Sequence, residues 1–131
     1  MSFLIDTNIL IYRLKNVGNV NENFIRNQDS TMLISVVSYG ELVFGAEKSS
    51  NREKNMKTVE AIKSIFPMLD VNSKIMSCFG RLKATLQKTG KNVDDMDLLI
   101  AATAMVNNLT LVTHNTKHFE NIPGLSFTDW Y

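Results

Sequence analysis

The chain has 131 residues, of which 44% are hydrophobic and 21% charged, and its formal net charge is +1. This composition is typical of an ordinary globular protein, and the charge balance favours neither a nucleic-acid binder nor a membrane-surface protein. The single cysteine, Cys78, excludes an internal disulfide and a cysteine-based zinc site. No apolar run reaches the roughly 18 residues that a membrane span needs, and the chain does not begin with a secretory signal pattern. We therefore expect a cytoplasmic protein with one domain over residues 1–131.

Short apolar runs alternate with longer stretches of helical periodicity along the chain. The apolar runs predict strands at Leu4–Ile5, Thr31–Ser35, Met68–Val71, Thr110–Thr113 and Leu125–Phe127. The periodic stretches predict helices over 9–14, 23–28, 38–46, 51–65, 72–88 and 98–106, and a helical turn at 116–119. The stretch 98–106 is apolar nearly all round, so it should form the most buried helix.

The alternation of strands and helices predicts an α/β fold with a mainly parallel sheet. Parallel neighbours require right-handed crossover connections, which place helices on both faces of the sheet. We therefore expect a three-layer α/β/α sandwich whose central sheet has about five strands.

An acidic residue directly follows the first predicted strand. Asp6 is followed by Thr7 and Asn8, either of which can cap the next helix. In an open α/β sheet, ligands bind at the carboxyl ends of the strands, and no basic residue precedes Arg13. Asp6 is therefore a candidate ligand-binding group. The alternative is that its carboxylate binds only the first-turn amides of the helix.

Glu41 and Asp97 also lie where helices are predicted to begin, and both have a simpler alternative role as parts of capping boxes, Ser38-x-x-Glu41 and Asp94-x-x-Asp97. Junctions that follow parallel strands share one sheet edge, which should bring Asp6 and Glu41 together. Carboxylates about 5 Å apart repel by roughly 3 kcal/mol per pair at an effective dielectric near 20. A hard cation such as Mg²⁺ or Mn²⁺ would offset this repulsion, and it can activate water for phosphodiester cleavage.

Four short motifs, in this order, resemble those of PIN-domain ribonucleases. They are Leu4-Ile5-Asp6-Thr7-Asn8, Ser38-Tyr39-Gly40-Glu41-Leu42, Asp97-Leu98-Leu99-Ile100-Ala101-Ala102 and Leu111-Val112-Thr113-His114-Asn115. The closing Phe119, Ile122-Pro123-Gly124-Leu125 and Trp130 are similar to the tail of VapC-type toxins of bacterial toxin–antitoxin pairs. The resemblance implies an α/β/α endoribonuclease that depends on Mg²⁺, with Mn²⁺ as an alternative.

The resemblance also implies roles for the residues that match these motifs. Asp6 and Asp97 would be the principal metal ligands, and Glu41 would bind through water or act on the attacking water. Thr7 and Thr113 would position carboxylates, waters or a substrate phosphate. The complete set of expected supporting residues is Thr7, Asn8, Ser38, Thr113 and Asn115.

The fourth motif departs from the family pattern, which often has an acid where this chain has Asn115. The missing charge argues against a second metal ion in the free site. Asn115 could ligate through its carbonyl oxygen or hold a water, and Asp95 is either a substitute acid or a solvated surface residue. His114 and His118 are four residues apart, but no third histidine or cysteine lies near them, so a separate metal site is not favoured.

Basic side chains around the expected site are candidates for binding RNA phosphates. The set comprises Arg13, Lys48, Arg52 and Lys91, with Lys15, Lys54 and Lys57 nearby. Contacts of this kind would weaken as the salt concentration rises. The simpler alternative is a solvated charged face.

We therefore expect a toxin of a toxin–antitoxin pair that cleaves RNA through carboxylate-bound metal and activated water. The family implies a VapB-type antitoxin as partner, and a homodimer or a toxin–antitoxin hetero-oligomer, without contact to a membrane. The alternative is a catalytically silent PIN-like module that binds RNA or protein.

Overall fold

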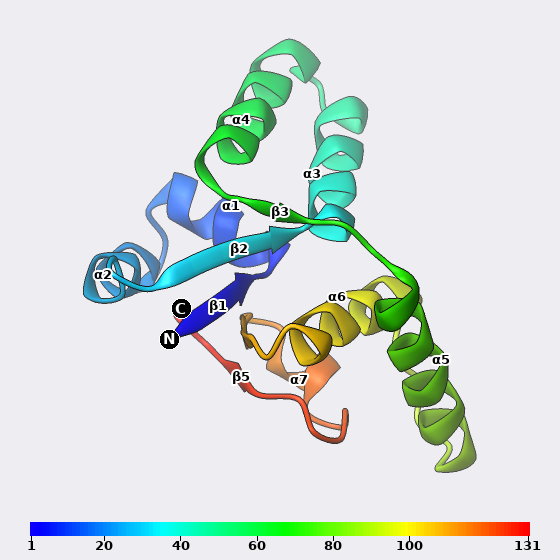
Figure 1. The fold of residues 1–131 in the computed structure, drawn as a ribbon. Coiled ribbons are helices and arrows are strands. Elements are labelled where there is room, and N and C mark those ends of the chain that lie inside the picture. Colours follow the sequence, from blue (N-terminus) through cyan, green and yellow to red (C-terminus); the bar gives the residue numbers. More distant parts are fainter.

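The computed structural model describes residues 1–131, and its fold is drawn in Figure 1. The strands are β1 (Ser2–Ile5), β2 (Thr31–Ser35), β3 (Met68–Leu69), β4 (Thr110–Val112) and β5 (Phe127–Thr128). The helices are α1 (Thr7–Lys15), α2 (Val20–Arg26), α3 (Val36–Lys48), α4 (Arg52–Ile65), α5 (Ser73–Lys88), α6 (Asp95–Val106) and α7 (Thr116–Phe119).

The five strands form one parallel sheet in the order β3-β2-β1-β4-β5. The first strand is therefore the central one, with β2 and β4 hydrogen-bonded on either side of it. Because all strands run in the same direction, their carboxyl ends meet at one edge of the sheet. The predicted parallel sheet is confirmed, and the residues that follow β1, β2 and β4 lie at this edge.

Alternate side chains of each strand point to opposite faces of the sheet, and each face has its own core. Phe3 and Ile5 of β1 belong to the core formed with α1, α2, α3 and α4, whereas Leu4 belongs to the core formed with α5, α6 and α7. Figure 1 shows these two groups of helices on opposite sides of the sheet. The three-layer α/β/α arrangement is therefore confirmed.

Helix α6 is the most deeply buried helix, as its apolar sequence predicted. Its buried residues are Leu98, Ile100, Ala101, Ala102, Thr103 and Ala104. The alanines let α6 pack closely between the sheet and α5, and Cys78 of α5 is a buried small side chain beside it. None of the helices combines the length and the apolar composition needed to cross a bilayer.

Several element boundaries differ from the sequence expectation, among them those of α2, α3, α6 (which begins at Asp95 and not at Leu98) and β5. Helix α2 begins at Val20, three residues before the predicted start, because the fully buried Val20 side chain fills the core beside α1. Helix α3 begins at Val36, directly after β2, and not at Ser38. Strand β5 lies at Phe127–Thr128 and not at 125–127, because these two residues pair with Leu111 and Val112 of β4.

Candidate active site

Asp6 lies at the carboxyl end of the central strand, where the chain enters α1. Its Oδ1 accepts a 2.8 Å hydrogen bond from the Thr7 backbone N–H, so Asp6, and neither Thr7 nor Asn8, is the N-cap of α1. Its Oδ2 accepts a second 2.8 Å bond from Thr113 Oγ1, at the end of the neighbouring strand β4. Asp6 is 4% exposed. The capping role is therefore confirmed, and the same carboxylate faces the shared sheet edge.

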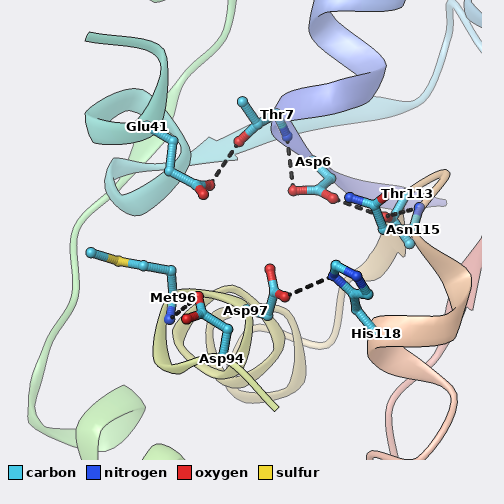
Figure 2. A network of polar contacts seen from close by, with 9 residues as sticks. All are labelled: Asp6, Thr7, Glu41, Asp94, Met96, Asp97, Thr113, Asn115 and His118. Carbon is cyan, nitrogen blue, oxygen red and sulfur yellow. Dashed lines mark hydrogen bonds and ion pairs between the residues drawn. The ribbon is translucent and has the colours of Figure 1, made fainter. Parts of the chain in front are cut away.

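Glu41 reaches this edge from α3, which follows β2 without a loop. Its Oε1 accepts a 3.0 Å hydrogen bond from Thr7 Oγ1 (Figure 2), so Thr7 joins the first two acids. The predicted capping box was wrong, because α3 begins earlier: Ser35 is the N-cap and accepts from the Val37 N–H at 3.0 Å. Glu41 therefore does not take part in capping the helix.

Ser38 lies inside α3, and its hydroxyl is fully buried without a hydrogen-bond partner. A buried polar group without a partner costs stability, typically about 1–3 kcal/mol. We therefore expect Ser38→Ala to raise the free energy of unfolding by about 1 kcal/mol, measured by urea denaturation. The matched control is Ser35→Ala, which removes the N-cap and should lower stability by about 1 kcal/mol. Destabilisation by Ser38→Ala would mean that the hydroxyl has a partner in solution.

Asp97 enters the site from the opposite side, on the first turn of α6. This helix begins two residues before Asp97, and its N-cap is Asp94, which accepts from the Met96 N–H at 3.2 Å. The Asp94 half of the predicted capping box is thus confirmed, but Asp97 takes no part in it. Asp97 Oδ2 instead lies 3.0 Å from His118 Nδ1 of α7. Figure 2 shows the other Asp97 oxygen directed toward the space between Asp6 and Glu41.

The pKa values of all three acids are raised, and the main cause in each case is burial. Burial raises the pKa of Asp6, hydrogen bonds from Thr113 and Thr7 lower it in part, and the negative charge of Asp97 raises it again. Burial also raises the pKa of Glu41, to which the charges of Asp6 and Asp97 add. Burial raises the pKa of Asp97, and the neighbouring His118 lowers it in part. The site therefore concentrates negative charge that the fold does not neutralise.

The chemistry of this donor set fits a hard divalent cation. All three acidic side chains offer oxygen, and no lysine or arginine forms an ion pair with any of them. No three acidic, histidine or cysteine side chains lie close enough together to form a complete metal cage. Mg²⁺ does not require one, because it usually keeps several waters and binds through one or two carboxylates together with substrate phosphate.

The remaining predicted site residues differ in what they contribute. Thr113 donates to Asp6, and Asn115 takes part through its backbone, since its N–H donates to Thr113 Oγ1 at 3.1 Å. Asn8 is not one of the residues of the network drawn in Figure 2. Asp95 is exposed and pairs with Lys83 at 3.0 Å, which agrees with a surface role and not with that of a substitute acid.

None of the four basic residues predicted to contact RNA pairs with the three acids, although Lys48 and Arg52 lie close together at the turn between α3 and α4. The Arg13 guanidinium stacks over the Phe24 ring at 4.4 Å, and Lys48 lies over the Phe44 ring at 5.0 Å. Arg52 forms an exposed ion pair with Glu47, and Lys91 Nζ donates to Asn121 at 3.3 Å. The fold therefore does not gather these four side chains into one patch around the acids.

The parallel α/β/α fold and the acidic sheet edge agree with a family match. The family model of the PIN domain matches residues 3–125 of this chain. The chain belongs to the PIN-domain family. Nucleases with a PIN domain generally depend on a divalent metal ion, which agrees with the oxygen donors of this site.

Full-length relatives place this PIN domain among the VapC ribonucleases. It is 38% identical to the tRNA(fMet)-specific endonuclease VapC of Shigella flexneri, over 99% of this chain and 98% of that protein. It is 33% identical to Ribonuclease VapC1 of Haemophilus influenzae (strain R2866), with the same coverage. Among solved structures, it is similar to VapBC2 from Rickettsia felis bound to a promoter DNA fragment. The TM-score is 0.92, the identity is 32%, and both chains are fully covered.

The residue of this PIN domain that sequence reasoning missed is His118. Its four-residue spacing from His114 suggested a pair, but the two side chains share no hydrogen bond: His114 Nδ1 lies 2.9 Å from Asp129, and the His114 ring stacks on Tyr131. The only signal available was that His118 closely follows the fourth motif. Its pairing with Asp97, 21 residues away in the chain, depends on where α7 packs.

Proposed function

We propose that this chain is the toxin of a toxin–antitoxin pair and that it cleaves RNA with Mg²⁺, or Mn²⁺, held by Asp6 and Asp97. The observation that carries this proposal is the convergence of three buried or half-buried carboxylates, none of them paired with a lysine or arginine, on the carboxyl edge of the sheet. When bound, the metal would supply an activated water and a positive charge beside the scissile phosphate.

Asp6 and Glu41 have different roles in this mechanism. Asp6 is held by Thr113 and by its own helix N-terminus, so its carboxylate does not have to reorganise when it binds a cation. The Glu41 carboxylate, held by Thr7, is placed to accept a proton from the attacking water. Its raised pKa makes Glu41 a stronger base than an exposed glutamate, which suits this task near neutral pH.

The direct test is a cleavage assay on total RNA with the purified protein. We expect cleavage with Mg²⁺, none with excess EDTA, and recovery when Mg²⁺ is restored. Equal cleavage with and without the chelator would contradict the metal mechanism. Binding of RNA without any cleavage, at any Mg²⁺ or Mn²⁺ concentration, would instead support the alternative of a catalytically silent binding module.

We further propose transfer RNA as the substrate. The support is that the relatives from Shigella flexneri and Salmonella typhimurium, 38% and 37% identical over nearly the whole chain, are both tRNA(fMet)-specific endonucleases. A comparison of initiator tRNA, elongator methionine tRNA and ribosomal RNA fragments at equal concentration tests this proposal. Cleavage of all three at the same rate would contradict it.

Basic side chains at the start of α4 would add affinity for RNA phosphates. Arg52 and Lys54 lie at the start of α4, and Lys54 lines a groove that also contains Glu41. We expect the double substitution Arg52→Glu, Lys54→Glu to weaken RNA binding and to reduce the slope of log K against log salt by roughly 1 to 2. Filter binding of an inactive variant at several salt concentrations measures both quantities. An unchanged slope would show that these side chains form only a solvated face.

A VapB-type antitoxin is the proposed partner, and the groove beside Glu41 is its proposed binding site. The support is that structures similar to this chain are VapBC complexes. The groove has a volume of about 560 Å³ and runs between α1, α3 and α4, with an apolar floor and Lys15 and Lys54 at its rim. A segment bound there would end at Glu41 and could place a basic side chain against the acids. A larger hollow, of about 750 Å³, lies at α2, away from the acids.

Gly45 offers a way to block this groove without disturbing the fold. It lies on α3 in the groove, and a Cβ placed on it would meet no atom within 4 Å. We expect Gly45→Gln to weaken antitoxin binding by about tenfold or more, equivalent to about 1.4 kcal/mol, in a titration with co-purified antitoxin. Gly80→Gln is the matched control, because Gly80 is a helical glycine with equally open space on α5. If both variants weakened antitoxin binding equally, the groove would not be the binding site.

A further inference from the structure

A continuous line of hydrogen bonds joins Asp6 to Asp97 through residues 113–118. Thr113 Oγ1 donates to Asp6 at 2.8 Å, and the same oxygen accepts the Asn115 N–H at 3.1 Å. The Asn115 carbonyl oxygen accepts the His118 N–H at 2.9 Å, and the His118 ring reaches Asp97 at 3.0 Å. The two carboxylates come from different elements, β1–α1 and α6, and this segment bridges them (Figure 2).

The bridging segment is fixed at both ends. At its start, the Thr113 N–H donates to Thr128 of β5 at 2.9 Å, and Thr113 is fully buried. At its end, the residue after His118 is Phe119, whose side chain is fully buried in the core shared with α6. His118 itself is 57% exposed, so the position of its ring depends on this anchor and on Asp97.

We propose that residues 113–118 form a brace that sets the relative placement of the Asp6 and Asp97 carboxylates, and that His118 is the positioning residue that holds Asp97 ready for a metal ion. The inference rests on the proposed function, because it concerns the same site. Asn115 contributes its backbone N–H and carbonyl to the brace, so the brace does not depend on the side chain at this position.

Two physical arguments support a positioning role for His118. An ionised carboxylate can only accept, so the His118 Nδ1 must donate, and it can do so in both the neutral and the charged imidazole. The bond fixes Asp97 Oδ2 and leaves the other oxygen facing Asp6 and Glu41 (Figure 2). Hydrogen-bond partners that orient a metal ligand in this way are typically worth about 10- to 100-fold in metal affinity.

The molecule contains a matched control in its second histidine–aspartate pair. His114 Nδ1 lies 2.9 Å from Asp129 Oδ2, and the His114 and Asp129 side chains are 37% and 35% exposed. This pair is part of the aromatic contact with Tyr131 and includes none of the three acids of the site. A histidine–aspartate pair is thus not by itself a metal-binding feature, and His114→Ala tests for effects that any loss of a surface histidine would cause.

The experiment measures Mn²⁺ binding to the full chain without RNA, by the electron paramagnetic resonance signal of free Mn²⁺. We expect His118→Ala to bind Mn²⁺ about 10- to 100-fold more weakly than the wild type. His114→Ala should bind as the wild type does, because the His114 side chain makes none of the hydrogen bonds of the brace. His118→Asn should restore most of the affinity, because its Nδ2 places a donor near the position of the imidazole Nδ1. Circular dichroism melts check that each variant is folded.

The outcomes separate this inference from the proposed function. If the wild type binds Mn²⁺ and Asp97→Asn does not, while His118→Ala matches the wild type, the brace is overturned and the metal site stands. If His118→Asn is as weak as His118→Ala, a donated hydrogen bond is not the cause, and the positioning role is overturned. If the wild type binds no Mn²⁺, or Asp97→Asn binds it equally well, the proposed metal site fails and the brace fails with it.

Discussion

Asp6→Asn is expected to lower metal-dependent RNA cleavage by about 100- to 1,000-fold, the loss typical when one group that stabilises a transition state is removed. The substitution keeps the size of the side chain and removes one negative charge from the centre of the site. Thr113 can adjust to the new amide, because its hydroxyl oxygen can accept as well as donate. The cleavage rate of an end-labelled RNA at saturating Mg²⁺ measures this loss.

The same substitution should make the metal-free protein more stable. Burial and the charge of Asp97 both raise the pKa of Asp6, which means that its ionised form is unfavourable in the fold at neutral pH. A neutral side chain at this position removes that cost, so the melting temperature should rise while the activity falls. The control is Asp29→Asn, an exposed acid in the turn before β2, at the opposite edge of the sheet, where neither quantity should change. A variant that is both inactive and less stable would indicate damage to the fold.

Adding Mg²⁺ or Mn²⁺ at about 100 times its dissociation constant is expected to stabilise the protein by about 2.7 kcal/mol, or roughly 10 °C for a chain of this size. A cation that binds the folded site and not the unfolded chain stabilises by mass action, and it also removes the repulsion among Asp6, Glu41 and Asp97. A thermal melt with and without the ion measures the shift. An equal shift in Asp6→Asn would place the bound ion elsewhere.

The pH dependence of the metal-free protein follows from the raised pKa values of the same three acids. Their ordinary values are 3.8 for Asp6 and Asp97 and 4.5 for Glu41, and the folded values are higher. Between the unfolded and folded values the folded state holds more protons, so stability falls as the pH rises through this window. We therefore expect this contribution to be complete below pH 3.8 and to be lost above the folded pKa values. Bound metal should reverse the loss, because it requires the ionised carboxylates.

Several features of the site could be predicted because neighbouring residues determine them. Asp6 directly follows a strand, so its position at the sheet edge depends only on the strand being parallel and central. Asp94 caps α6 through a hydrogen bond that spans two residues, a contact that local sequence specifies. Glu41 was correctly expected at the same edge, although its helix was expected to begin two residues late.

The end of β2 at Ser35 was predicted correctly, but the start of α3 directly after it was not. Ile34 and Ser35 pair with Met68 and Leu69 of β3, so β2 continues to Ser35 and the helix begins at once. A pattern-based reading favours the capping box at Ser38, since nothing local shows that Ser35 already provides the cap. Ser35 and Ser38 are both local candidates for the cap, and the pairing of Ser35 with Leu69 of β3 keeps Ser35 in the extended conformation that an N-cap adopts.

The sequence by itself determined the layers, the parallel sheet and the identity of the acids, because alternating apolar residues and strand-to-helix junctions are local patterns. Only the tertiary structure decided how the acids are held. Thr113 contacts Asp6, 107 residues away in the chain, because β4 pairs with β1. His118 contacts Asp97, 21 residues away, because α7 packs beside the start of α6. Contacts between elements that the chain brings together only by folding leave no periodicity in the sequence.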